Sequence, residues 1–317
     1  MDTYLLNIGI VKKTLFTRKQ KKHKDMSIID EIKQSFKNGN TLIKLIYLNL
    51  AVFLAVKIVT IVYFLFNIQG SSFSLVNLLA LPADIHSLTY KPWTIFTYMF
   101  LHEGFIHILF NMLWLFWFGQ IFLRFLNEKN LLSLYIVGGL FGGFLYVLSY
   151  NIFPVFNPTT SIALGASASV MAIVIATSVY APNYTINLMF IGPVKLKYIA
   201  LFSIVLDILS IPTSNSGGHI AHLGGALFGF IYISQYRKGK NITKGFGNIM
   251  DKIFSLFKPK SKFKVTYKRP MTDIEYNKTK AEEQKYVDKI LEKIAQKGYN
   301  SLSKKEKELL FKMSNKK

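Results

Sequence analysis

The sequence predicts an all-α, polytopic membrane protein with six spanning helices. Of its 317 residues, 51% are hydrophobic and 15% are aromatic, and several apolar stretches approach twenty residues. That length of helix crosses the hydrocarbon core of a bilayer. The expected spans are residues 42–66, 104–126, 131–150, 167–181, 194–211 and 219–236.

Strongly basic segments flank this apolar region. Of the 39 Lys and Arg residues, nine lie in 1–40 and 23 lie in 237–317. A net charge of +22 would suit nucleic acid, but basic ends around a membrane domain are typical of segments that face anionic lipid on the cytoplasmic side. We therefore expect a lipid bilayer as a partner and no nucleic acid. The predicted location is a bacterial plasma (inner) membrane, with both termini cytoplasmic.

These features divide the chain into four parts: a basic N-terminal arm (1–41), a membrane domain (42–236), a basic linker (237–273) and a helical hairpin tail (274–317). The stretch 67–103 inside the membrane domain is apolar but contains several polar and proline residues, so we expect an irregular or re-entrant element at the membrane interface.

The tail has the pattern of two helices. Apolar residues recur at helical spacing around Ile290, Gly298 suits a helix end, and Ser303 with Glu306 has the spacing of a capping box. A docking module for a cytoplasmic partner and a partly ordered charged tail are both compatible with this pattern. The chain contains no cysteine, which excludes thiol nucleophiles and disulfides.

Three clusters of polar residues begin the second, fourth and sixth spans. They are His102, His107 and Asn111; Gly165, Ala166 and Ser167; and His219 and His222. These three spans run in the same direction, so we expect the clusters at one membrane depth. Polar groups in lipid are costly and indicate function. A serine and a histidine that meet there form a candidate nucleophile and base.

Small residues explain how the two spans could touch. Ala168, Ala172 and Ala176 recur every four residues in the fourth span, as do Gly225 and Gly229 in the sixth. Such faces allow close helix approach in lipid, and a contact here would carry Ser167 toward His222. Four glycines of the third span, between 138 and 143, indicate close packing too.

The start of the fourth span suits a developing negative charge, because free backbone N–H groups and the positive end of the helix dipole meet there. His107 and Asn111 share one helix face and can both donate. No carboxylate obviously completes a triad. Asp207 in the fifth span could reach this depth or face the interface, and a Ser–His dyad is the simpler interpretation.

At these residues the sequence resembles the rhomboid family of intramembrane serine proteases. His102-x4-His107-x3-Asn111, Gly165-Ala166-Ser167 and His222-x2-Gly225-x3-Gly229 match its three motifs in order. The resemblance implies that Ser167 is the nucleophile and His222 the base, with His107, Asn111 and a backbone N–H forming the oxyanion hole. It implies supporting roles for His102, Gly165, Gly225 and Gly229, no cofactor or metal, and a transmembrane protein substrate cut near the outer surface.

The match has departures. Ala168 stands where the family motif ends in Gly, Thr94 stands where a Trp-Arg pair has Arg, and Met171 stands where some members have Tyr. Ser169 is a rival nucleophile that lies about 200° around the helix from Ser167.

Three functions other than a serine protease also need to be considered. A zinc protease through His102, Glu103 and His107 fails on spacing, because zinc-binding helices place their histidines four residues apart rather than five. A transporter is not favoured, because the sequence shows no paired intramembrane charges and no evident repeat. A non-catalytic rhomboid-like binder or chaperone of membrane segments is the main alternative.

Overall fold

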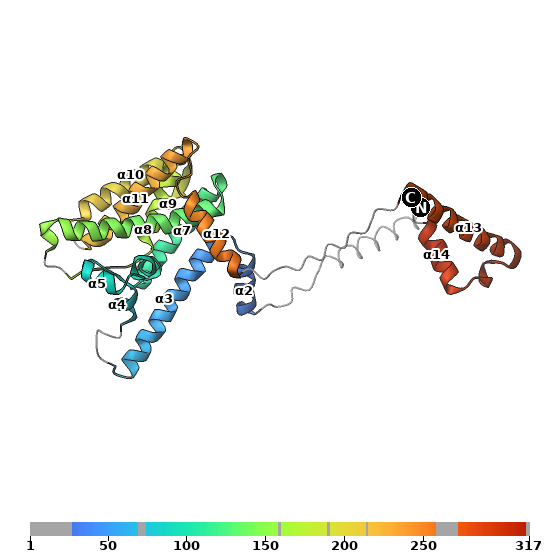
Figure 1. The fold of residues 1–317 in the computed structure, drawn as a ribbon, viewed down its shortest axis with the longest axis horizontal. Coiled ribbons are helices and arrows are strands. Elements are labelled where there is room, and N and C mark those ends of the chain that lie inside the picture. The colour runs from blue at the N-terminus through green and yellow to red at the C-terminus, as the bar shows by residue number, and fades with distance from the viewer. Residues whose placement is uncertain are drawn as a thin grey trace, which may run out of the picture. The chain divides into compact units, whose positions relative to one another are not determined.

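The computed structural model describes residues 27–68, 74–157, 160–188, 191–213, 215–257 and 272–314. The chain forms two compact units, Met1–Phe257 and Lys258–Lys317. Helices dominate the described residues of both units (Figure 1), which confirms the predicted all-α class.

Six helices of the first unit coincide with the expected spans within a few residues. They are α3 (Thr41–Leu65), α7 (Phe105–Phe125), α8 (Glu128–Ile152), α9 (Ser167–Tyr180), α10 (Leu196–Ser210) and α11 (Ser216–Arg237). Among the described residues, only α3, α7 and α8 are both long and apolar enough to cross a membrane. Helices α9 and α10 have 14 and 15 residues, fewer than the roughly 20 that span a bilayer. The count of six spans is therefore not established.

Helix α9 forms the centre of the bundle. Every residue from Ala168 to Ser178 is buried, and α9 makes its most extensive contacts with α11 and α8. Small residues allow the neighbouring helices to enclose α9 closely. At Gly142 of α8, for example, an added Cβ would lie only 2.6 Å from the Ala168 Cβ, so a larger residue there would force the two helices apart. This contact confirms the packing role expected for the glycines of α8.

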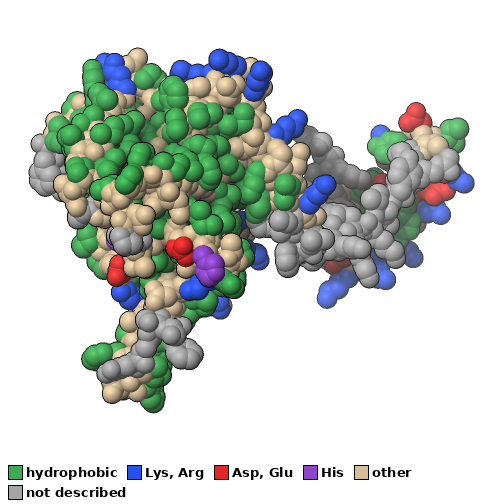
Figure 2. Space-filling model, turned by 60° about the vertical axis from the view of Figure 1, so that its left-hand side comes forward, with side chains coloured by type: hydrophobic (Ala, Val, Ile, Leu, Met, Phe, Trp, Pro, Cys, Tyr) green, Lys and Arg blue, Asp and Glu red, His purple; other side chains and the backbone are tan. Residues whose placement is uncertain are grey.

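The outside of the bundle is broadly apolar. Figure 2 shows hydrophobic side chains spread over it, with Lys and Arg at its margins. Helix α3 illustrates this surface, because Leu54, Ile58 and Phe64 are more than half exposed. An apolar exterior is what lipid contact requires.

The segment between α3 and α7 consists of short pieces, as its broken pattern predicted. They are α4 (Leu75–Leu79), β1 (Leu81–Pro82), α5 (Ile85–Tyr90), α6 (Thr94–Thr97) and the 3₁₀ turn η2 (Tyr98–Phe100). Strand β1 pairs antiparallel with β2 (Ile162–Ala163), just before α9. A second hairpin, β3 (Thr185–Leu188) and β4 (Gly192–Lys195), joins α9 to α10, and the turn η3 (Pro154–Phe156) follows α8.

The basic segments contain helices. The N-terminal arm includes α2 (Ile28–Asn38), and α12 (Lys244–Phe257) lies in the stretch predicted to be a linker. This part of the predicted linker is therefore helical, and α12 packs against α8. Its Asp251 forms an ion pair with Lys129 at 2.7 Å. Residues 258–271 of the predicted linker fall outside the described residues.

The second unit is a helical hairpin of α13 (Asp273–Lys297), the turn η4 (Tyr299–Ser301) and α14 (Lys304–Ser314). Gly298 is the C-cap of α13. The Ser303 N–H donates to Glu306 at 2.6 Å, and the Glu306 N–H donates to the Ser303 hydroxyl at 3.4 Å. The predicted helix stop and capping box are thus confirmed.

Candidate active site

The first turns of α7, α9 and α11 surround one small cavity of about 220 Å³. His107 of α7, Ser167 and Ala168 of α9, and Gly218 and Ala221 of α11 line it. The three polar clusters therefore meet at the same end of the bundle, as their position in alternate helices predicted.

A strained turn presents Ser167 to this cavity. Gly165 has a φ of +129°, a value that side chains disfavour. Its N–H donates to the Tyr98 carbonyl at 2.9 Å, while the β1–β2 pair holds the preceding residues. A Cβ at Gly165 would lie 2.9 Å from the His107 ring and 3.5 Å from the Ser167 hydroxyl. Glycine is thus required both for the backbone and for the space beside His107.

His102 supports this turn from the interior. It is fully buried, and the Ala166 N–H points at its Nε2, 3.5 Å away. Its ring meets the His107 ring edge-on, with the centroids 5.2 Å apart. These contacts suit the supporting position that the resemblance implied.

The backbones of α9 and α11 touch along the predicted small-residue faces. A Cβ added at Gly225 would collide with the Ala168 carbonyl, and one at Gly229 with the Ala172 carbonyl. Both contacts advance by four residues, so the helices run parallel and in register. Ser167 consequently lies within one turn of the level of His222.

Ser169 points elsewhere. It is fully buried, and a Cβ added at Gly139 of α8 would collide with its hydroxyl oxygen. The side chain therefore faces α8, away from α11, as the rotation of about 200° between the two serines requires.

Asp207 is the residue whose part the sequence left open. Its Oδ1 accepts hydrogen bonds from Nδ1 of His222 at 2.9 Å and from Nδ1 of His219 at 2.8 Å. An ionised carboxylate only accepts, so each imidazole carries its proton on Nδ1. Asp207 is buried, and the signal that could have found it is its position as the only acidic residue in an apolar helix. His219, which the sequence placed beside His222, shares this carboxylate.

Two expected contacts are missing from the described part of the chain. It shows no hydrogen bond between Ser167 and His222, a bond that is often long before substrate binds. The Asn111 amide donates to the His107 carbonyl at 2.9 Å within its own helix. His107 lies beside the Gly165 turn, whereas Asn111 would have to turn its side chain to reach an oxyanion.

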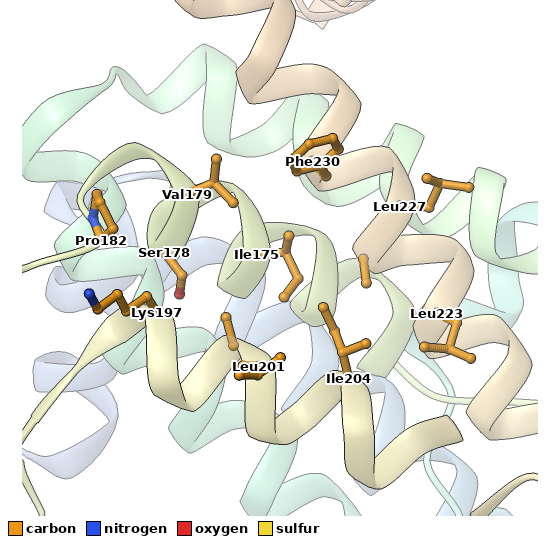
Figure 3. Close-up of a pocket in the computed structure, with 12 residues that line it drawn as sticks. Ile175, Ser178, Val179, Pro182, Lys197, Leu201, Ile204, Leu223, Leu227 and Phe230 are labelled. Atoms are coloured by element: carbon orange, nitrogen blue, oxygen red, sulfur yellow. The ribbon is translucent and has the colours of Figure 1, made fainter. Parts of the chain in front are cut away.

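An apolar groove of about 560 Å³ lies between α10 on one side and α9 and α11 on the other (Figure 3). Ile175, Leu201 and Phe230 line it, and Lys197 lies at one end. Leu223 lines the other end and directly follows His222 in the sequence. The side of α10 that carries Asp207 is thus next to a loosely filled space.

Comparison with known proteins places this architecture in a family. Residues 89–238 match the Rhomboid domain family, and this range contains all three polar clusters. The chain belongs to the rhomboid family. Residues 272–316 match a family of unknown function (DUF6576), which corresponds to the helical hairpin.

Two relatives of this rhomboid protein are mitochondrial by name. RHOMBOID-like protein 12, mitochondrial, of Arabidopsis thaliana is 34% identical over 158 residues, which cover 46% of this chain and 47% of the relative. Presenilin-associated rhomboid-like protein A, mitochondrial, of Danio rerio is 32% identical over 137 residues, 42% of this chain and 35% of the relative. The chain thus spans less than half of either relative. These names contradict the prediction of a bacterial plasma membrane with cytoplasmic termini, which rested only on charge distribution.

Proposed function

We propose that this rhomboid protein is an intramembrane serine endopeptidase. Ser167 is the nucleophile, His222 is the general base, and Asp207 positions His222. The observation that carries the proposal is the hydrogen bond from His222 Nδ1 to Asp207, one turn or less from the level of Ser167.

The chemistry follows from this tautomer. With its proton on Nδ1, His222 has a lone pair on Nε2 that can take the Ser167 proton. The serine oxygen then attacks the scissile carbonyl and forms an acyl-enzyme, and His222 returns the proton to the leaving amine. Water hydrolyses the acyl-enzyme in a second, similar step.

The developing oxyanion needs donors close to Ser167. The first backbone N–H groups of α9 are free of intrahelical partners and lie at the positive end of the helix dipole. We propose that they act together with the His107 imidazole, which contacts the Gly165 turn, and with Asn111 after rotation of its side chain.

The proposed substrate is a transmembrane protein, cut within its membrane segment or next to it. The apolar exterior of the bundle, exposed along helices such as α3, supports contact with lipid. A bundle of six spans with an attached tail module, divided at residues 41, 236 and 273, remains our proposal for the organisation of the chain.

The test is cleavage of a single-span model protein by the purified chain. Ser167→Ala and His222→Ala should each abolish cleavage, whereas Ser169→Ala should retain it, and a fluorophosphonate should label Ser167. Full cleavage by Ser167→Ala would disprove the assignment. Intact folding with tight substrate binding but without cleavage or labelling in the unchanged protein would favour the non-catalytic binder.

A further inference from the structure

Asp207, His219 and His222 form a cluster with a composition that proteolysis alone does not require. Each of the three residues offers one ligand-type atom, a carboxylate oxygen or an imidazole nitrogen, and these atoms all lie within 4.8 Å of one another. A single base needs one carboxylate partner, and here the same oxygen also holds a second histidine.

Two imidazoles and one carboxylate are a ligand set that suits zinc. Tetrahedral coordination with bonds of about 2.0–2.2 Å sets neighbouring ligand atoms about 3.4 Å apart. The present separations from Oδ1 are 2.8 and 2.9 Å, so each must widen by about half an ångström. The side chains of His219 and His222 are 21% and 23% exposed, which leaves a path for the ion and room for water as a fourth ligand.

We propose that Asp207, His219 and His222 form an inhibitory zinc site. Zn²⁺ takes the space between the three side chains, replacing the two N–H···O hydrogen bonds with metal bonds from both Nδ1 atoms and the carboxylate. The ion is not part of the peptidase chemistry, which separates this site from the zinc protease considered from the sequence.

Inhibition follows from where the imidazole proton must lie. When Nδ1 of neutral His222 binds the metal, its proton moves to Nε2. Nε2 then donates and has no lone pair for the Ser167 proton, so the base is lost without loss of the fold. This consequence rests on the proposed function, whereas the binding of the metal does not.

Metal binding can be measured without catalysis. The Ser167→Ala chain, purified without a histidine tag and stripped with a chelator, is titrated with Zn²⁺ by calorimetry and with Co²⁺ by visible absorption. We expect one ion per chain and the intense absorption of tetrahedral Co²⁺. His219→Ala should weaken binding by at least about tenfold. His86→Ala, which removes a histidine of α5 from outside the cluster, should leave it unchanged.

The matching activity assay uses the chain with Ser167 intact. Zn²⁺ should inhibit cleavage and a chelator should restore it. In His219→Ala, cleavage without metal should stay within a few-fold of the unchanged chain, while the inhibitory Zn²⁺ concentration should rise by the same factor as the binding constant.

Two results would overturn the proposal: no stoichiometric binding to the Ser167→Ala chain, or binding that His219→Ala leaves intact. Binding without any peptidase activity in the unchanged chain would keep the metal site and reject the proposed function instead. The two ideas therefore fail separately.

Discussion

Nδ1 of His222 on α11 donates a hydrogen bond to Oδ1 of Asp207 on α10, at 2.9 Å. This bond joins two helices that are otherwise separated over part of their length by the apolar groove. It defines which nitrogen of His222 is free, and it adds a third polar member to a site in which the sequence favoured two.

Replacing Asp207 with Asn tests its positioning role. The amide can present N–H to His222 Nδ1 and stabilise the wrong tautomer, so we expect kcat to fall roughly 100-fold with little change in KM. Nitrogen chemical shifts of labelled His222 should report the change of tautomer. The control is Ser203→Ala, one helical turn before Asp207. It removes a hydroxyl that donates a hydrogen bond to the Ile199 carbonyl, and it should leave both readouts unchanged. An equal loss in the two variants would indicate a merely structural effect.

Gly165→Ala should inactivate the protein. The positive φ of Gly165 costs a side chain about 1–3 kcal/mol, and the new methyl would press on the His107 ring. We expect at least tenfold slower fluorophosphonate labelling and a lower unfolding temperature. The control is Gly104→Ala at the start of α7, where an added Cβ meets nothing within 4 Å. Normal labelling of Gly165→Ala would contradict the described turn.

Gly225→Ala should separate α9 from α11. Its methyl would collide with the Ala168 backbone carbonyl, which cannot move like a side-chain tip. We expect a loss of roughly 1–3 kcal/mol, measured by unfolding in detergent, and slower cleavage. Gly245→Ala on α12 adds the same methyl with nothing within 4 Å and should not destabilise the protein. Unchanged stability of Gly225→Ala would rule out the close contact.

Ser169→Ala should be tolerated. The hydroxyl of Ser169 is buried and lacks a hydrogen-bond partner within the described part of the chain, so its removal leaves no new unpaired group. We expect cleavage within about twofold of the unchanged chain and equal or slightly higher stability. A loss comparable to that of Ser167→Ala would transfer the nucleophile to Ser169.

Acid should loosen the tail hairpin. The Ser303 N–H and the Lys293 ammonium hold the pKa of Glu306 at about 2, below its ordinary 4.5. A lowered pKa means that this stabilisation is complete above about pH 4.5 and is lost as the pH falls toward 2. Hydrogen exchange in the full chain, corrected for intrinsic rates, should show opening around Ser303 in this interval. Glu306→Gln should show it already at neutral pH, and the control Glu308→Gln should not.

Much of the fold could be predicted from local patterns. Hydropathy located all six helices of the bundle within a few residues, and Gly298 and Ser303 marked the turn of the hairpin, because such signals act within a few residues of the chain. Within the predicted linker, basic composition obscured an amphipathic helix, α12, which packs on α8.

By itself the sequence determined that Ser167, His107 and His222 begin alternate helices and so meet at one end of the bundle. It also determined that Ala168 and Gly225 allow close approach. Tertiary structure alone decided that Asp207 faces His222 and His219, that Ser169 faces α8, and that Asn111 bonds to its own helix. These outcomes depend on how each helix is rotated about its axis. That rotation is set by contacts between residues distant in sequence, and a local sequence pattern does not report such contacts.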